Sequence, residues 1–204
     1  KIGLTSEAVQ RQLGVDQPDY GVLTDAMHVS QELPVQWSEL IQPKAEMEVG
    51  FILGKDLPSG QITMDVLKDA ISAAVSSIEI VGSRVEKWDI RITDTIADNA
   101  SASHFVIGDA VTDWASLDLV NCKMEMMRAG EVVSQGCGSA CMGNPLNAAL
   151  WLAQTMAKLG TPLKKDYIIL AGALGPMVPV NPGDSFTGNI EGLGSVSVSF
   201  GTTE

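Results

Sequence analysis

The chain has 204 residues, of which 45% are hydrophobic, and its formal net charge is −12. This length suits a globular protein with one large domain, or one with a small appendage, and we assign residues 1–204 to a single domain. The 25 acidic residues against 13 basic ones argue against nucleic acid or an anionic membrane surface as the main partner. Because no apolar run approaches the roughly 18 residues of a membrane span, we expect a cytoplasmic protein.

The N-terminal half of the chain predicts helices and strands joined by marked turns. A Thr-Ser start, an acid in the first turn and a glycine stop favour a short helix over residues 5–14. The sequence VDQPDYG is a turn that carries Asp16 and Asp19, and EMEVGFIL predicts a buried strand. Beyond it, a threonine cap and helical spacing favour a helix over 63–74, which gives way to a strand around 77–81.

The C-terminal half predicts a hairpin, a long helix and further strands. Alternation over residues 117–136 around a central RAGE turn indicates the hairpin, with Met124, Met126 and Val132 on covered faces. A proline near the first turn, apolar helical spacing and a glycine stop are typical of a helix over 144–160. Strands are expected in DYIILAGAL, SFTGNIEG and GSVSVSF. Because strands and long helices do not alternate regularly, the predicted class is α+β rather than a doubly wound parallel sheet.

Two acids in the stretch QPKAEMEVGFIL stand out, because the stretch otherwise predicts a buried strand. Successive side chains of a strand point to opposite faces, so Glu46 and Glu48 share one face. Glu79 lies in the later predicted strand between two isoleucines. Like charges at short distance disfavour each other's ionisation, so such acids need protons, basic partners or a cation.

Two interpretations of these acids are open from spacing alone. Three strand carboxylates supply the hard oxygen ligands that suit Mg²⁺ or Mn²⁺. Alternatively, the acids form ion pairs at a strand edge with basic residues, namely Lys44, Arg84 and Lys87.

Several blocks of the sequence resemble one known family. They are KIGLTS, LGVDQPDYG, QPKAEMEVGFIL, IEIVGSR, DTIADNAS, NPLNAALWLA and LAGALGPMVPVNPGD. The chain resembles the fumarylacetoacetate hydrolase superfamily and, within it, the 2-hydroxypenta-2,4-dienoate hydratases of bacterial aromatic meta-cleavage pathways. The resemblance implies a mixed β-roll or distorted β-barrel with flanking helices. It also implies that a further N-terminal segment precedes Lys1 in the whole protein.

The resemblance assigns roles to particular residues. It implies that Glu46, Glu48 and Glu79 hold one divalent metal, Mg²⁺ or Mn²⁺. It places Asp19 and Lys1 as catalytic groups, although a turn acid and a surface lysine are the ordinary alternatives. The substrate is expected near residues of the GALGPM loop and of the ADNAS stretch, namely Gly172, Leu174, Gly175, Asn99 and Ser101. For these, a plain strand exit and a closed turn are the alternatives.

The resemblance leaves three functions in competition. The first is a metal-dependent hydratase that adds water to 2-hydroxypenta-2,4-dienoate to give 4-hydroxy-2-oxopentanoate. In this case, residues 1–204 would form a single catalytic domain. The second is 4-oxalocrotonate decarboxylase of the same pathway, and the third is a non-catalytic scaffold partner. Gly82 in IVGSR and the GALGPM loop favour the hydratase by resemblance. A homo-oligomer, and a complex with a pathway decarboxylase, are the partners that the resemblance implies.

Overall fold

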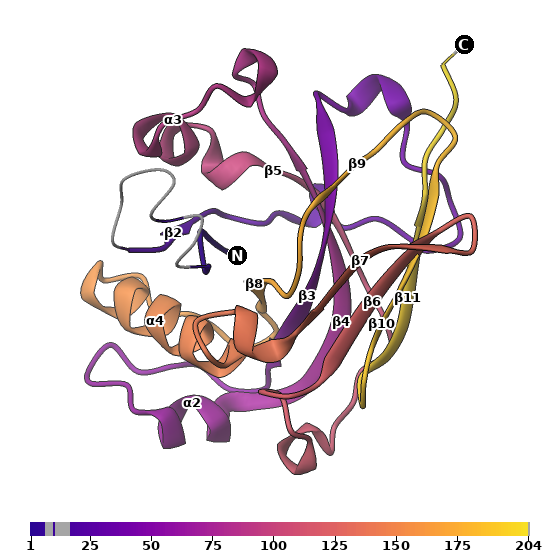
Figure 1. Cartoon of the computed structure of the whole chain (residues 1–204). Helices are drawn as coiled ribbons and strands as arrows, with labels where there is room; N and C mark the ends of the chain where they lie inside the picture. The colour runs from indigo at the N-terminus through magenta and orange to yellow at the C-terminus, as the bar shows by residue number, and fades with distance from the viewer. Residues whose placement is uncertain (7–9, 11–16, 204) are drawn as a thin grey trace.

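The computed structural model describes residues 1–6, 10 and 17–203, and its strands form three antiparallel sheets (Figure 1). A small ribbon consists of β1 (Ile2–Gly3) and β2 (Asp19–Tyr20). The largest sheet contains, in spatial order, β5 (Ala102–Ile107), β4 (Ile71–Gly82), β3 (Pro43–Leu53) and β8 (Ile168–Ala173), with β9 (Val178–Pro179) beside β3. The four-stranded sheet contains β11 (Gly194–Ser199), β10 (Ser185–Ile190), β6 (Lys123–Arg128) and β7 (Glu131–Cys137).

The α-helices whose bounds the structure describes are α2 (Met64–Ala70), α3 (Ile92–Ala97) and α4 (Pro145–Lys158). In α4, the Asn144 side chain accepts a hydrogen bond from the Leu146 amide, and a proline occupies the first turn, as the sequence predicts. The helix predicted over 5–14 lies for the most part outside the described residues.

Part of the hydrophobic core lies between the two larger sheets, and part lies under α2 and α4. Along β3, alternate side chains from Ala45 to Leu53 point toward the four-stranded sheet, and a Cβ atom at Gly188 of β10 would clash with Met47. The opposite face of the five-stranded sheet carries β1 and α4 (Figure 1). Neither strand order closes on itself, so the α+β class and the roll are confirmed, while the described strands form no closed barrel.

The helix predicted over 63–74 is shorter than expected. The Thr63 side chain caps it by accepting a hydrogen bond from the Val66 amide, but the helix ends at Ala70 and β4 begins at Ile71. Most of β4 is buried on both faces, so its small and branched residues show no alternation that would mark the start of a strand.

The predicted hairpin over 117–136 is confirmed as β6 and β7, joined at Ala129 and Gly130. Met124 and Met126 are fully buried. Val132 was expected on a covered face, but its side chain is 48% exposed. The reason is a register irregularity between Met126 and Met127, where the ladder to β7 shifts.

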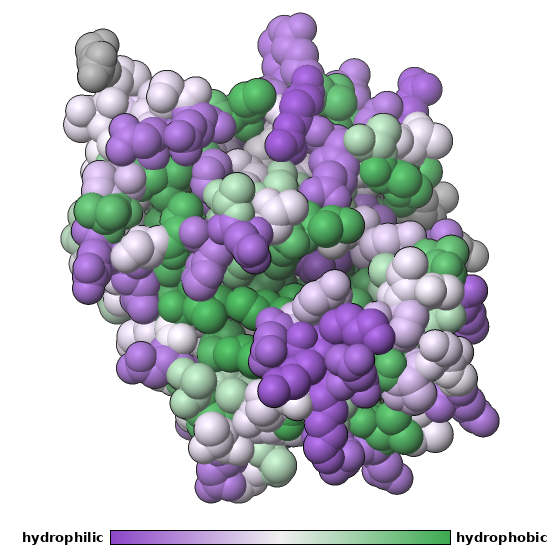
Figure 2. Space-filling model, turned by 180° about the vertical axis from the view of Figure 1, so that it is seen from behind, coloured by the Kyte–Doolittle hydropathy of each residue, from purple (hydrophilic) through white to green (hydrophobic). Residues whose placement is uncertain are grey.

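The outer surface is mixed in polarity. On the side turned away from the viewer of Figure 1, hydrophobic residues gather in and around a central hollow with hydrophilic residues on its rim (Figure 2). Over the whole described surface, the exposed large hydrophobic residues are Val22, Leu33, Ile41, Ile96, Val132, Leu159, Tyr167 and Met177. None of the helices within 1–6, 10 and 17–203 is long and apolar enough to cross a membrane.

Candidate active site

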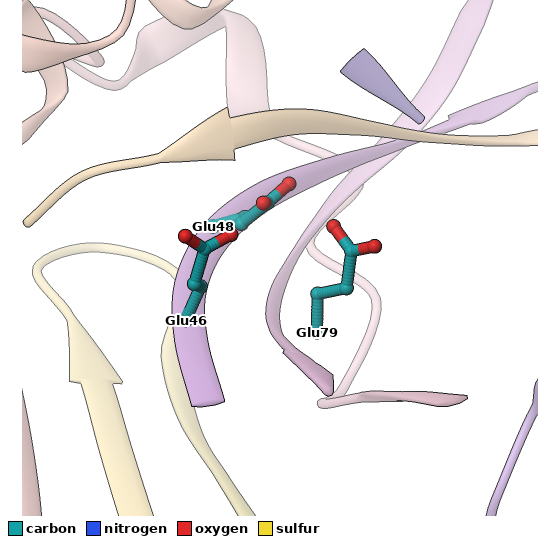
Figure 3. A group of neighbouring side chains, drawn as sticks. All are labelled: Glu46, Glu48 and Glu79. Carbon is teal, nitrogen blue, oxygen red and sulfur yellow. The ribbon is translucent and has the colours of Figure 1, made fainter. Parts of the chain in front are cut away.

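Three carboxylates converge on one face of the five-stranded sheet, and two of them, Glu46 and Glu48, share that face as their spacing predicts (Figure 3). Glu46 of β3 and Glu79 of β4 are direct partners across the antiparallel pair, and Glu48 follows two residues later on the same face. One oxygen from each of the three lies within 4.8 Å of the others. Glu48 and Glu79 are fully buried and Glu46 is half-buried. The two central strands therefore place three negative charges in a largely solvent-free space.

Glu48 is held by the backbone of β8. Its Oε2 accepts a hydrogen bond from the Gly172 amide at 2.7 Å. The β3–β8 ladder is irregular between Glu48 and Gly50, and Gly172 has φ of +106°, a conformation that disfavours any residue with a Cβ. The resemblance places this glycine near the substrate. In the structure, that amide already contacts the protein's own carboxylate.

Replacing Gly172 with alanine is expected to destabilise the protein by more than the usual cost of a left-handed alanine. The new Cβ would clash with the Thr5 side chain and displace the amide that binds Glu48. The matched control is Gly130→Ala, where φ is also positive but no atom lies within 4 Å of the new Cβ. Measured by chemical denaturation, the control should lose about 1–2 kcal/mol of unfolding free energy relative to the wild type. An equal loss in both variants would contradict the role given to Gly172.

The basic partner of the cluster is Lys1. Its Nζ lies 3.0 Å from Oε1 of Glu79, and the Lys1 side chain is 3% exposed. Burial by itself lowers the pKa of this ammonium, but the charges of Glu79, Glu48 and Glu46 outweigh burial and raise the pKa above its ordinary value. Lys1 is therefore held in its charged form.

None of the three basic residues that were alternative partners forms an ion pair with the acids among the described residues, although the charge of Lys44 lowers the pKa of Glu46. Lys44 sits over the Trp88 ring, with Nζ 4.1 Å from the ring centre. Arg84 pairs with Asp98 at 3.4 Å, and Lys87 pairs with its neighbour in the chain, Glu86, at 3.2 Å. Apart from Lys1, neither carboxylate oxygen of Glu79 has a hydrogen-bond donor among the residues described.

Glu46 and Glu48 keep their protons more tightly than free glutamates do. Burial, and then the charge of Glu79, raise the pKa of Glu46 to about 7, and the same causes raise the pKa of Glu48. When ionised, the three acids and Lys1 together carry a net charge of −2, from three negative groups and one positive group. The cluster is therefore short of positive charge.

This charge deficit predicts how the stability of the metal-free protein changes with pH. Because the pKa of Glu46 is about 7 in the folded protein, against an ordinary value of 4.5, the folded state binds more protons than the unfolded state between these values. The contribution of Glu46 to the free energy of unfolding is therefore greatest below pH 4.5 and falls as pH rises through about 7.

We expect that thermal unfolding in a chelator will show Tm falling between about pH 5 and about pH 8. The fall should be smaller in Glu46→Gln, which has no proton to lose at this position. A steeper fall in the variant than in the wild type would contradict the charge deficit at this cluster.

Asp19 lies on β2, directly opposite Gly3 on β1. Lys1 and Gly3 are two residues apart, so the Asp19 and Lys1 side chains extend from the same face of this ribbon. Asp19 is buried, and its charge contributes to the raised pKa of Glu46. Its Oδ2 accepts a hydrogen bond from the Thr95 hydroxyl, while its Oδ1 has no partner among the described residues. No pattern in the sequence had singled out Thr95.

The other predicted substrate contacts have partners within the protein. The Asn99 side chain bonds both the amide and the carbonyl of Val22, and the Ser101 hydroxyl donates to Asp98. The Leu174 amide donates to the Met47 carbonyl in β3. Gly175 packs closely against the Gln135 backbone, where a Cβ would clash.

A cavity of about 820 Å³ reaches Lys1, the ion-pair partner of Glu79, although none of the three glutamates lines it. Lys1 forms part of its wall, together with Tyr20, His28, Phe105 and residues of α4 and of the 160–169 segment. Phe105 pairs with Glu79 across β5 and β4, so its side chain lies on the same sheet face as the acids. The cavity has the size of a small-molecule site.

The chain is similar to proteins of known family. The family described as fumarylacetoacetate (FAA) hydrolase, C-terminal, matches residues 3–200. A 2-keto-4-pentenoate hydratase of Dechloromonas aromatica (strain RCB) is 54% identical over 200 residues, covering 98% of this chain and 76% of that protein. A 2-hydroxyhexa-2,4-dienoate hydratase of Comamonas testosteroni is 45% identical over 202 residues, with coverage of 98% and 76%.

A solved structure is similar to this chain over nearly its whole length. The 4-oxalocrotonate decarboxylase from Pseudomonas putida G7, complexed with magnesium and adipate, superposes with a TM-score of 0.91 at 34% identity. The match covers 98% of this chain and 76% of that one. The chain therefore belongs to the fumarylacetoacetate hydrolase family and, within it, to the hydratases, which are hydro-lyases.

Proposed function

We propose that the protein adds water to 2-hydroxypenta-2,4-dienoate, or to a close homologue of it, in aromatic meta-cleavage catabolism. The product would be 4-hydroxy-2-oxopentanoate. The observation that carries the proposal is the cluster of Glu46, Glu48 and Glu79, whose one ion pair among the described residues is with Lys1. The hydratase relatives are more similar to this chain than the decarboxylase is, which favours water addition over decarboxylation. So costly a group of buried charges also favours an enzyme over a non-catalytic scaffold.

The three glutamates would hold one divalent cation, Mg²⁺ or Mn²⁺. All three donors are hard carboxylate oxygens, and a divalent ion would balance the net charge of −2 of the acids with Lys1. Apart from Lys1, no described side chain donates a hydrogen bond to the Glu79 oxygens, which also fits a ligand role. When bound, such a cation would polarise the carbonyl oxygen of a chelating 2-oxo acid.

The reaction itself needs groups that move protons. When the dienol becomes a ketone, the 2-hydroxyl proton leaves and C5 gains a proton, which leaves a C3–C4 double bond conjugated to the carbonyl. Water then supplies a hydroxyl group to C4 and a proton to C3, so one molecule of water is added overall. We assign Asp19 as the base that accepts the proton of the attacking water. Lys1 is the proton donor or electrostatic partner of the dienolate, and its raised pKa favours the electrostatic role.

Substrate contacts belong to the same proposal. The cavity whose wall includes Lys1 has room for a small organic acid. The GALGPM loop, with Gly172, Leu174 and Gly175, borders the cluster through the amide that binds Glu48. The roles of Asn99 and Ser101 in substrate binding stay predictions.

The test is to identify the product made in ¹⁸O-labelled water. Purified protein with Mg²⁺ should convert the dienoate to a product with one ¹⁸O at the C4 hydroxyl and should release no CO₂. Release of CO₂ from a dicarboxylate substrate at comparable efficiency would replace the hydratase with the decarboxylase. A protein that only raises the activity of an added decarboxylase would be a scaffold.

We also propose a cytoplasmic homo-oligomer, which could associate with a pathway decarboxylase. The exposed hydrophobic residues, such as Leu33, Ile96 and Leu159, supply apolar surface for association between copies. Light scattering of the purified protein measures the assembly, and a monomer at all concentrations would exclude it.

A further inference from the structure

We propose that Thr95 is a positioning residue for Asp19, and that the segment from α3 through Ser101 clamps the strand that carries this acid. This inference rests on the proposed function, because it concerns the residue assigned as the base. The clamp consists of α3 and the adjoining turn Asn99–Ser101.

The first observation is the contact between the two side chains. Thr95 and Asp19 are 4% and 5% exposed, and the Thr95 hydroxyl donates a hydrogen bond to Oδ2 of Asp19. A hydroxyl has one proton to donate, so Thr95 occupies one lone pair of the carboxylate and fixes its orientation. Oδ1 is left without a donor among the residues described. In the role proposed for Asp19, this oxygen is the one that accepts the proton of water.

The second observation is that the Gly3 backbone packs against the other side of the Asp19 carboxylate. Gly3 is the direct partner of Asp19 in the ribbon, and a Cβ atom there would clash with Oδ1 of Asp19. The carboxylate therefore lies between the Gly3 backbone and the Thr95 hydroxyl. This leaves little freedom to rotate about the bond that carries the carboxylate.

The third observation is that the turn after α3 is strained and tied to the end of β2. Asn99, Ala100 and Ser101 have φ of 55°, 52° and 52°, a conformation that costs energy for residues other than glycine. The Asn99 side chain accepts from the Val22 amide at 2.7 Å and donates to the Val22 carbonyl at 2.8 Å, as a neighbouring strand would.

These contacts fix the distance between α3 and β2. A Cβ at Gly21 would clash with the Asn99 carbonyl oxygen, so the two backbones are in direct contact. Strain of this kind persists only where the surroundings enforce it, and it is common at functional sites. The consequence is that the segment from α3 through Ser101 cannot move away from β2 as a unit without breaking the bonds between Asn99 and Val22.

The experiment compares three variants of the metal-loaded enzyme. Thr95→Val keeps nearly the same shape but removes the hydroxyl, and it should lower kcat by about 10- to 100-fold, the usual range for a bond to a charged group. KM and metal affinity should change little. Thr95→Ser restores the hydroxyl and should restore kcat. Thr93→Val, at an exposed threonine of the same helix, should behave as the wild type.

A double variant separates positioning from a general structural role. If Thr95 acts through Asp19, Thr95→Val should lower kcat no further in an Asp19→Asn background. Thr95→Ala serves the same purpose if the valine variant does not fold. Wild-type kcat in Thr95→Val, or equal losses in the serine and valine variants, would overturn the proposal while the hydratase function stands.

A measurement that needs no turnover completes the test. In protein labelled with ¹³C at aspartate carboxyl carbons, the Asp19 signal is the one missing from Asp19→Asn. It should move in Thr95→Val and stay in Thr95→Ser. An unmoved signal in Thr95→Val would refute the contact. If the wild type hydrates no dienoate, the proposed function fails and the kinetic role of Thr95 fails with it, whatever the signal shows.

Discussion

Glu46→Gln is expected to lower divalent-metal affinity by more than about 100-fold, because loss of a residue that merely supports a ligand already costs about 10- to 100-fold. Turnover should be nearly abolished. Glu48→Gln and Glu79→Gln should have the same effect, since the three carboxylates meet on one sheet face. Titration calorimetry with Mg²⁺ and Mn²⁺ measures the affinities. Glu131→Gln, at an exposed acid on β7, is the control. Wild-type affinity in all three variants would exclude the glutamate site.

The metal-free variants should differ from one another in stability. Glu46→Gln removes one like charge from the cluster, so its Tm in a chelator should equal or exceed that of the wild type above about pH 7. Glu79→Gln removes the partner that lies 3.0 Å from Lys1 and leaves a buried ammonium less well paired. Breaking a buried pair from one side costs about 3 kcal/mol or more. A higher Tm in Glu79→Gln than in the wild type would contradict the Lys1 pairing.

Asp19→Asn is expected to lower kcat by roughly 10²- to 10⁴-fold, the usual contribution of a positioned proton-transfer group. Metal affinity should change little, because Asp19 lies on the β1–β2 ribbon and not among the three glutamates. Steady-state kinetics at saturating metal gives the result. Asp109→Asn, at an exposed acid outside the site, is the control. Wild-type kcat in Asp19→Asn would refute the assignment of Asp19 as the base.

Local patterns in the sequence predict part of this site well. A strand places alternate residues on one face, so the spacing of Glu46 and Glu48 already implies that they project together. Most of β4 is buried on both faces, so the hydrophobic pattern does not say which face Glu79 takes. Only its pairing with Glu46 across the ladder decides this.

Contacts between distant segments could not be predicted from the sequence. Lys1 and Glu79, like Thr95 and Asp19, are far apart in the chain, and no local period links them. The amide of Gly172 is a similar case, because the glycine signals an unusual backbone but not the identity of the anion that it contacts. The prediction that the helix extends to residue 74 was wrong for a related reason. Buried small residues fit both a helix and a strand that is buried on both faces.

The pairing of Glu46 with Glu79 also bears on how the sheet assembles. Since β3 and β4 are buried on both faces over most of their length, hydrophobic alternation discriminates weakly between their native pairing and a slip of one residue. A one-residue slip would turn Glu79 toward the four-stranded sheet and leave Glu46 and Glu48 behind. A cation that needs all three carboxylates would stabilise only the native pairing. Divalent ions present during refolding would then favour the native strand register over the slipped one and raise the yield of correctly folded chains.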